Sequence, residues 1–168
     1  DTILEQTEKL DFLIQSLVKL SRMESGIIAV HSEDTAITQM LESIQQQFNV
    51  KVREKNITLS LCDTDLHVRC DPKWTVEAIG NIVDNAIKYT ACGGNVQIKV
   101  EQYSFFVKID IIDDGIGIEK EEIPKIFGRF YRSLSVADQP GVGIGLFLAR
   151  KIIQAQKGYI KVTSKRGK

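Results

Sequence analysis

An apolar run that ends abruptly in two carboxylates constrains this sequence more than any other feature. The segment FFVKIDII occupies residues 105–112 and is followed directly by DDGIGI at 113–118. A short apolar run bounded by turn signals predicts a strand, and the paired glycines predict a tight turn after it. Two acids at a strand end can hold a metal ion, act as acid and base, or recognise a hydrogen-bond donor. The segment alone leaves these three interpretations open.

The remaining pattern predicts an α+β protein with a two-layer architecture. Strands are predicted within residues 27–34, at 57–61, 66–70 and 95–102, and at 158–164 at the end of the chain. Helices are predicted over residues 1–24, from 37 to about 48, from 72 to about 90 and from 145 to 156, with a short acidic helix after the glycine turn. Because helices and strands mix without strict βαβ alternation, we expect a mixed sheet with helices on one face.

The first helix is amphipathic. Ile3, Leu10 and Leu17 are spaced by sevens, and so are Leu13 and Leu20. Such a stripe favours a helical bundle or a dimer, although packing on the helix's own domain is the alternative. We expect the helix to end at residues 24–26, with Gly26 as its C-terminal cap.

A polar face is predicted on the helix that begins with Asp71 as N-cap and Pro72 in the first turn. Asn81, Asn85 and Lys88 share this face because they are spaced by four and three. An asparagine oxygen suits Mg²⁺ and a lysine supplies positive charge to phosphate. Taken alone, a solvated polar face explains the same spacing.

A glycine-rich stretch, GVGIG at 141–145, runs directly into the last helix. Amides at a helix N-terminus bind anions and glycines allow close approach, yet this spacing fits a flexible loop equally well. The aromatic segment before it, with Phe127 and Phe130, predicts either a mobile lid or a surface loop attached to the core. Arg129 and Arg132 are available there for phosphate.

Composition excludes few classes of function. Lys+Arg and Asp+Glu both number 22, so net charge indicates neither nucleic acid nor a membrane surface as partner. The three cysteines, Cys62, Cys70 and Cys92, do not have the spacing of a zinc site, and we expect reduced thiols. The chain starts within a helical pattern and stops after SKRGK, so we expect a fragment of a longer protein.

The order of the motifs is more specific than any one of them. NIVDNAIKYT, DDGIGI, IFGRFYR and GVGIGLFLARKII resemble, in this order, the N, G1, F and G2 boxes of bacterial sensor histidine kinases, within the gyrase/Hsp90/histidine-kinase/MutL superfamily. LDFLIQSLVKLSRMESG resembles the second helix of the family's dimerisation and phosphoacceptor hairpin. The resemblance implies a Bergerat-type ATP-binding fold over residues 26–168 and the hairpin helix over residues 1–25.

The resemblance also implies roles for single residues. Asp113 matches the carboxylate that accepts a hydrogen bond from the adenine amino group, and we expect it to be buried; Asp114 stands where the family commonly has Asn and should face solvent. Asn85 matches the Mg²⁺ ligand, and Asn81, Lys88 and Arg132 match positions at the reacting triphosphate. The remaining nucleotide-binding positions implied by the match are Tyr89, Gly115, Gly117, Ile118, Gly141, Gly143, Gly145 and Leu146.

The implied function is transfer of the γ-phosphoryl group of Mg-ATP to a histidine. Related ATPases have a glutamate at the position of Asn81, so we expect transfer rather than hydrolysis. His31 and His67 lack the acidic neighbour of the family's phosphoacceptor and are expected to be structural, so this chain should not phosphorylate itself. The family implies a response regulator as partner, a homodimer formed through the hairpin and the cytoplasmic part of a membrane-anchored parent. A serine kinase of the anti-sigma type and a non-catalytic scaffold are the alternatives.

Overall fold

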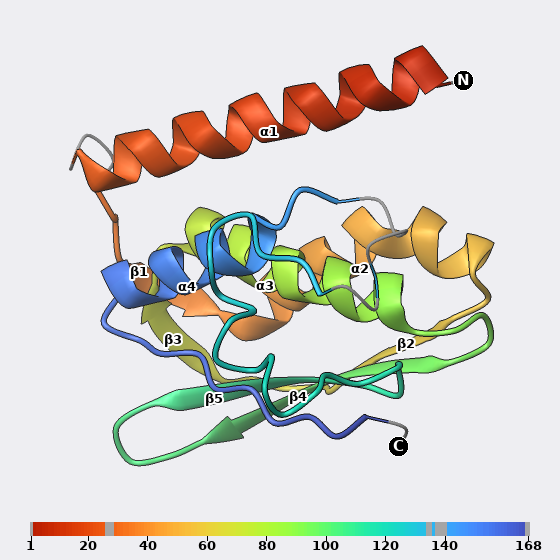
Figure 1. Ribbon diagram of the computed structural model, residues 1–168. Helices are drawn as coiled ribbons and strands as arrows, with labels where there is room; N and C mark the ends of the chain where they lie inside the picture. The colour runs from red at the N-terminus through yellow and green to blue at the C-terminus, as the bar shows by residue number, and fades with distance from the viewer. Residues whose placement is uncertain (1, 26–28, 134–135, 137–140, 167–168) are drawn as a thin grey trace.

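The computed structural model describes residues 2–25, 29–133, 136 and 141–166. The helices are α1 (Thr2–Glu24), α2 (Ile37–Glu54), α3 (Pro72–Tyr89) and α4 (Gly145–Ala155). The strands are β1 (Glu33–Ala36), β2 (Thr58–Leu61), β3 (His67–Cys70), β4 (Asn95–Gln102) and β5 (Val107–Asp113). In Figure 1, α2, α3 and α4 lie on one side of the long strands and α1 lies beyond these helices. The predicted α+β class, with helices over one face of the strands, is confirmed.

The strands form two small sheets in the described part of the chain. β1 pairs antiparallel with β3, and β4 is the central strand of a three-stranded sheet with β2 and β5. β2 and β4 are parallel, whereas β4 and β5 form the predicted antiparallel hairpin. Val96 lies opposite Asp113 in this hairpin, so the end of β5 lies beside the start of β4.

Local chemistry determines where α3 begins. Asp71 Oδ1 accepts a hydrogen bond from the backbone N–H of Trp74 at 3.1 Å, and Pro72 occupies the first turn, where its missing N–H has no helical partner. The apolar side of α3 is buried through Ala78, Ile79, Val83, Ala86 and Ile87. This packing fixes α3 against its neighbours, so its polar residues occupy defined positions.

Two apolar clusters hold the layers together. The larger one joins α2 and α3 to the strands, with Ile44 and Ile98 fully buried. In the smaller one, Leu20 of α1 is buried against residues of α3 and α4. Lys19 also forms an ion pair with Glu77 of α3 at 2.7 Å. The C-terminal half of α1 therefore packs on its own domain, and no described helix is both long and apolar enough to cross a membrane.

The first strand lies later in the chain than the sequence predicts. β1 begins at Glu33, which is opposite Cys70 of β3, and residues 29–32 carry no strand pairing. Before the strand, the backbone N–H of His31 donates to Asp71 Oδ2 at 2.9 Å instead of to a neighbouring strand. The expected cap Gly26 lies outside the described residues.

Two further predicted elements are wrong. Residues 120–130 form successive turns instead of an acidic helix, because Pro124 has no N–H with which to continue a helical ladder. Residues 158–164 carry no strand pairing. This final segment is attached by side chains, since Ser164 Oγ accepts a hydrogen bond from the backbone N–H of Ile118 at 2.8 Å. A ladder of backbone bonds would be needed to define a strand here.

Candidate functional site

The polar face of α3 forms one wall of the candidate site. Asn81 Nδ2 donates to the carbonyl of Glu77 at 2.9 Å, which orients the Asn81 amide. Lys88 Nζ lies 4.8 Å from the centre of the Tyr89 ring, in cation–π range. The half-buried Asn85 lies between Asn81 and Lys88 in the sequence, and its side chain forms no hydrogen bond with the described residues. Its amide oxygen therefore remains available to a ligand.

Asp113 lies at the end of β5, on the face that also carries Ile109 and Ile111. Those two isoleucines pack against the larger core, so Asp113 extends the core-facing row of the strand. Its Oδ1 accepts a hydrogen bond from the backbone N–H of Gly115 at 3.0 Å, and Oδ2 has no partner in the described part of the chain. The prediction that this carboxylate is buried is wrong: Asp113 is exposed, because it is the last strand residue with only the glycine turn beyond it.

Asp114, unlike Asp113, bonds to the neighbouring strand through both of its carboxylate oxygens. Its two carboxylate oxygens accept from the backbone N–H and the side-chain amide of Asn95, both at 2.8 Å. The Asn95 backbone bond, followed by the side-chain bond, holds the pKa of Asp114 below its usual value. The residue is exposed as expected, yet its carboxylate is not simply solvated, since it ties the end of β5 to the start of β4. The Asp114 carboxylate is thus occupied by Asn95, whereas Asp113 keeps one oxygen without a partner among the described residues.

The glycine turn packs against the C-terminal end of α3. The backbone N–H of Ile116 donates to the carbonyl of Tyr89 at 3.3 Å. A side chain at Gly115 would come within 2.7 Å of the same carbonyl oxygen. Gly117 has a φ of +72°, and a side chain there would meet the backbone of Lys165 at 2.5 Å. Both glycines are therefore required by close approach, and they bring the turn to the half-buried Tyr89.

The segment between the turn and α4 is attached by aromatic and cationic contacts. Arg150 of α4 lies 5.3 Å from the ring centre of Phe127, and Arg129 lies 4.8 Å from that of Phe147. Tyr131 Oη donates to Glu122 Oε1 at 3.1 Å. The pKa of Glu122 is lowered, mainly by the hydrogen bond from Ser133 and to a smaller extent by the one from Tyr131. The pKa of Tyr131 is raised, mainly by burial and to a smaller extent by its hydrogen bond to Glu122. These contacts support the prediction that aromatic residues anchor this segment.

The glycines before α4 approach the polar face of α3. A side chain at Gly141, whose φ is +150°, would lie 2.7 Å from Lys88 Nζ. A side chain at Gly145 would lie 3.0 Å from Asn81 Oδ1. The fold therefore places residues 141–145, which lead into α4, beside the two ends of the Asn81–Lys88 face. The sequence predicts this proximity only through the family resemblance.

The other predicted residues lie around this junction. Gly143 has a φ of +76°, and a side chain there would lie 2.6 Å from the carbonyl oxygen of Tyr131. Leu146 is half-buried in the first turn of α4. Arg132 Nη2 donates to the carbonyl of Val136 at 3.2 Å, within its own segment. Ile118 is half-buried and bonded through its backbone to Ser164, which no sequence pattern singled out. Ser164 was missed because its role depends on the path of the final segment.

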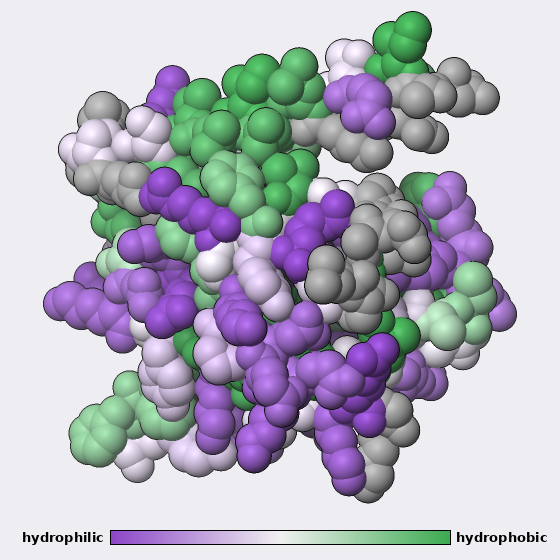
Figure 2. Space-filling view, in the orientation of Figure 1, coloured by the Kyte–Doolittle hydropathy of each residue, from purple (hydrophilic) through white to green (hydrophobic). Residues whose placement is uncertain are grey.

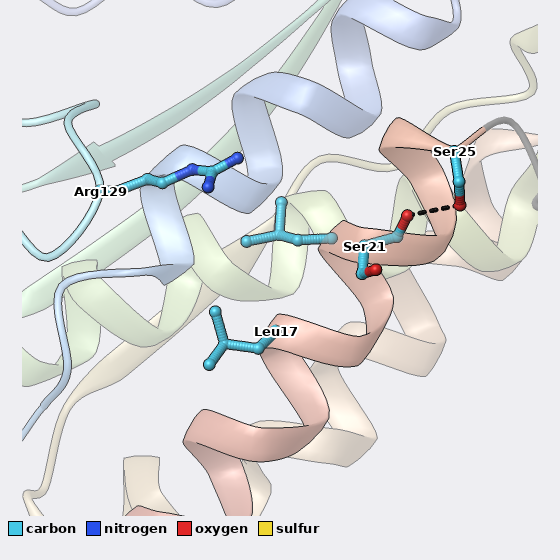
Figure 3. Close-up of a pocket in the computed structure, with 5 residues that line it drawn as sticks. Leu17, Ser21, Ser25 and Arg129 are labelled. Carbon is cyan, nitrogen blue, oxygen red and sulfur yellow. Dashed lines mark hydrogen bonds between the residues drawn. The ribbon is translucent and has the colours of Figure 1, made fainter.

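A hollow of about 540 Å³ lies elsewhere, between α1 and the aromatic segment (Figure 3). It is lined by Leu17, Leu20, Ser21, Ser25 and Arg129. In Figure 3, Leu17 and Arg129 point toward the same space from their separate elements, and a dashed bond joins Ser25 to the Ser21 carbonyl. None of the predicted nucleotide-binding residues lines it. The candidate site therefore remains the region between α3, the glycine turn and the start of α4.

A family model for histidine kinase-, DNA gyrase B- and HSP90-like ATPases matches residues 70–168, which is more than half of the chain. The chain belongs to this ATPase family. It is therefore an ATP-binding domain, and the matched region contains every predicted site residue from Asn81 to Leu146. The resemblance read from the four motifs is confirmed at the level of the family.

Among curated relatives, the sensor histidine kinase WalK of Bacillus subtilis is 32% identical over 168 residues, covering 97% of this chain and 28% of that protein. The sensor protein kinase PmrB of Pseudomonas aeruginosa is 29% identical over 153 residues, covering 91% and 32%. The chain thus spans about a third of the length of these relatives, or less.

Solved structures show the same fold. The Acinetobacter baumannii histidine kinase AdeS has a TM-score of 0.79 at 25% identity, covering 98% of this chain and 77% of that chain. A catalytic domain of the histidine kinase ThkA has a TM-score of 0.64 at 26% identity, covering 75% and 82%. This ATPase-family member therefore has the fold of histidine kinase catalytic domains. Because the match to AdeS covers 98% of the chain, it includes α1.

Proposed function

We propose that this chain is the catalytic domain of a sensor histidine kinase. In this proposal residues 26–168 are the ATP-binding domain, and residues 1–25 are the second helix of the dimerisation and phosphoacceptor hairpin. The domain transfers the γ-phosphoryl group of ATP to a histidine, from which it passes to an aspartate of a response regulator. The names of the relatives and of the fold neighbours, which are sensor kinases, support this function.

One observation carries the proposal: two segments that are distant in sequence, the turn after Asp113 and residues 141–145, meet along α3. Gly145 approaches Asn81, Gly141 approaches Lys88, and the turn after Asp113 bonds to the Tyr89 carbonyl. Glycines at such approaches leave room for a ligand to reach backbone amides. An ATP molecule laid along α3 would have its base at the Asp113 end, beside Tyr89, and its phosphates toward the Gly145 end, beside Asn81.

The adenine end of the site uses Asp113. Its Oδ1 is bonded to Gly115, so Oδ2 would accept the hydrogen bond from the adenine amino group. A carboxylate is acceptor-only when ionised, which suits an N–H donor and disfavours a carbonyl at the same position of another base. Tyr89, Ile118 and Gly117 would line the pocket beside it.

The phosphate end uses cations and amides. Lys88 and Arg132 would offset negative charge on the triphosphate, and Gly141, Gly143, Gly145 and Leu146 would form the backbone around it. Asn85 would hold Mg²⁺, which takes oxygen ligands and keeps waters and phosphates. The donor set fits, because the side chain of Asn85 has no hydrogen-bond partner among the described residues and its amide oxygen is a ligand that Mg²⁺ takes. Bound Mg²⁺ would neutralise part of the phosphate charge.

Phosphoryl transfer to a protein is favoured over hydrolysis by the groups around Asn81. An amide cannot take a proton from water, and the nearest acid one turn earlier, Glu77, is engaged with Lys19 at 2.7 Å. Transfer relies on positioning and charge stabilisation, which Asn81, Lys88 and Arg132 would supply without a general base. We therefore propose slow hydrolysis and productive transfer.

The acceptor would be a histidine outside these residues. His67 Nδ1 lies 3.0 Å from a carboxylate oxygen of Asp34, on the β1–β3 sheet. His31 lies in the segment before β1, where its backbone N–H donates to Asp71. Both belong to structural contacts away from the α3 face.

A receiver domain as the next phosphate acceptor, after the histidine, is consistent with the neighbour ThkA, which was solved in complex with the response regulator protein TrrA.

The exposed side of α1 supports dimerisation through the hairpin. Its exposed apolar side chains include Ile3, Leu4, Leu10, Phe12, Ile14, Leu17 and Val18. Figure 2 shows hydrophobic side chains gathered along this helix, above a largely hydrophilic surface. A bundle with the rest of the hairpin and a second copy would cover them. We also propose that the domain is the cytoplasmic part of a membrane-anchored parent, as in the family.

The test is transfer from γ-labelled ATP to the separately prepared hairpin domain of the full-length protein. The proposal predicts an acid-labile, alkali-stable phosphoprotein that forms with the unaltered chain and not with Lys88→Met. An acid-stable phosphoserine product would identify a serine kinase instead. ATP binding without transfer to a folded hairpin would identify a nucleotide-binding scaffold.

A further inference from the structure

Lys55, at the C-terminal end of α2, contacts the end of a different helix. Its ammonium donates to the carbonyls of Ile87, Lys88 and Thr90 at 2.8, 2.9 and 2.6 Å. An ammonium has three N–H donors, so these bonds use its full donor capacity. The acceptors belong to the last turn of α3, where a helix leaves carbonyls without partners and carries partial negative charge. Lys55 therefore acts as a C-terminal cap supplied by another element.

The carbonyl of Tyr89 is the one carbonyl in this run that does not bond to Lys55. It lies between the acceptors of Lys55 and accepts instead from the backbone N–H of Ile116 in the glycine turn. Four successive carbonyls are thus divided between one side chain and the turn that follows Asp113. The backbone of Lys55 is also held, because its carbonyl accepts from Gly93 N–H in the loop after α3 at 3.0 Å.

We propose that Lys55 is a positioning residue for the nucleotide site. It holds the last turn of α3 in the orientation that presents the Tyr89 carbonyl to the glycine turn, and so fixes Asp113 relative to Lys88 and Tyr89. It acts through these residues and not on the nucleotide itself. This inference rests on the proposed binding of adenine by Asp113.

The contact is specific to Lys55 among its neighbours. Lys88, in the same turn of α3, directs its ammonium to the Tyr89 ring and toward Gly141. Lys51, one turn earlier on α2, reaches Asp84 of α3 at 2.5 Å but is exposed and bonds to no carbonyl of the α3 end. Lys51→Met therefore removes one α2–α3 lysine contact without touching the junction, and it is the matched control for Lys55→Met.

The test measures ADP and GDP binding by calorimetry for the unaltered chain, Lys55→Met and Lys51→Met. We expect Lys55→Met to bind ADP about tenfold more weakly, or weaker still. The free energy that hydrogen bonds of a charged donor contribute corresponds to a change in affinity of about that factor. Its preference for ADP over GDP should also narrow, which a general loss of stability would not cause. Lys51→Met should match the unaltered chain. Lys55→Met with unchanged ADP affinity and preference would overturn the inference, as would equal losses in both variants.

A second measurement needs no folded Lys55→Met protein. In ¹H–¹⁵N spectra of lysine ammonium groups, Lys55 should give a slowly exchanging signal that shifts on addition of ADP, and Lys51 should not. An ammonium signal of Lys55 that is insensitive to saturating ADP would overturn the inference. If the unaltered chain binds no ADP, the proposed nucleotide site fails instead, so the two failures are distinguishable.

Discussion

Replacing Asp113 by asparagine tests the adenine assignment with a minimal change of shape. The amide oxygen of the substituted side chain can still accept the hydrogen bond from Gly115 that Asp113 Oδ1 accepts at 3.0 Å, so the turn should remain closed. The other position changes from a charged acceptor to an NH₂ donor. This donor would face the amino group of adenine, which is also a donor.

The size of the effect follows from the chemistry and the exposure of this carboxylate. A hydrogen bond to a charged group contributes about 1.5–3 kcal/mol, and the lower part of this range applies because Asp113 is exposed. Asp113→Asn should therefore weaken ADP binding by about 10- to 30-fold, which corresponds to about 1.5–2 kcal/mol. Binding of GDP, whose base presents a carbonyl at that position, should weaken much less.

Calorimetric titration of Asp113→Asn with ADP and GDP measures both quantities, with Asp114→Asn as the control. The Asp114 carboxylate bonds to Asn95, so its substitution should reduce stability and leave ADP affinity within about twofold. Equal ADP affinity in Asp113→Asn and the unaltered chain would refute the assignment. A loss of ADP and GDP affinity in the same proportion would show that the base is not read by this residue.

The remaining predictions concern the metal, two glycines with positive φ and acid stability. Asn85→Ala should abolish the gain in ADP affinity that Mg²⁺ provides and leave binding in EDTA unchanged, as titrations with and without the metal would show. Gly93→Ala should cost about 1–2 kcal/mol, because its φ is +82° with open space around it. Gly117→Ala should cost more in the same denaturant series, because backbone atoms also block its side chain. Asp114 has a folded-state pKa below its usual 3.8, so its stabilisation is complete above that pH and is lost as the pH falls through the lower value. The unfolding midpoints of Asp114→Asn and the unaltered chain should therefore differ at neutral pH and converge in acid.

The sequence predicts well wherever a local cause determines the structure. Asp71 and Pro72 specify the start of α3, and the alternating segments around Tyr103 specify the β4–β5 hairpin. The motif residues on α3 could be placed on one face because helical spacing alone determines it. These features depend on neighbours within a few residues, and so the sequence contains them directly.

The features that could not be predicted depend on contacts between distant segments. Residues 158–164 have strand-like composition but no ladder partner in the described structure, and Pro124 prevents the acidic helix despite favourable neighbours. No sequence pattern connects Lys55 to the end of α3, because three carbonyls of another helix become its acceptors only after folding. The exposure of Asp113 likewise depends on what covers the end of β5.

The central claim is that the face of α3, the glycine turn and the start of α4 form one binding site for ADP and ATP. Titration of the unaltered chain with ADP, in Mg²⁺ and in EDTA, tests it most directly. We expect saturable binding of one ADP per chain that is tighter with Mg²⁺. A folded chain, verified by its cooperative unfolding, that binds no ADP under either condition would contradict it.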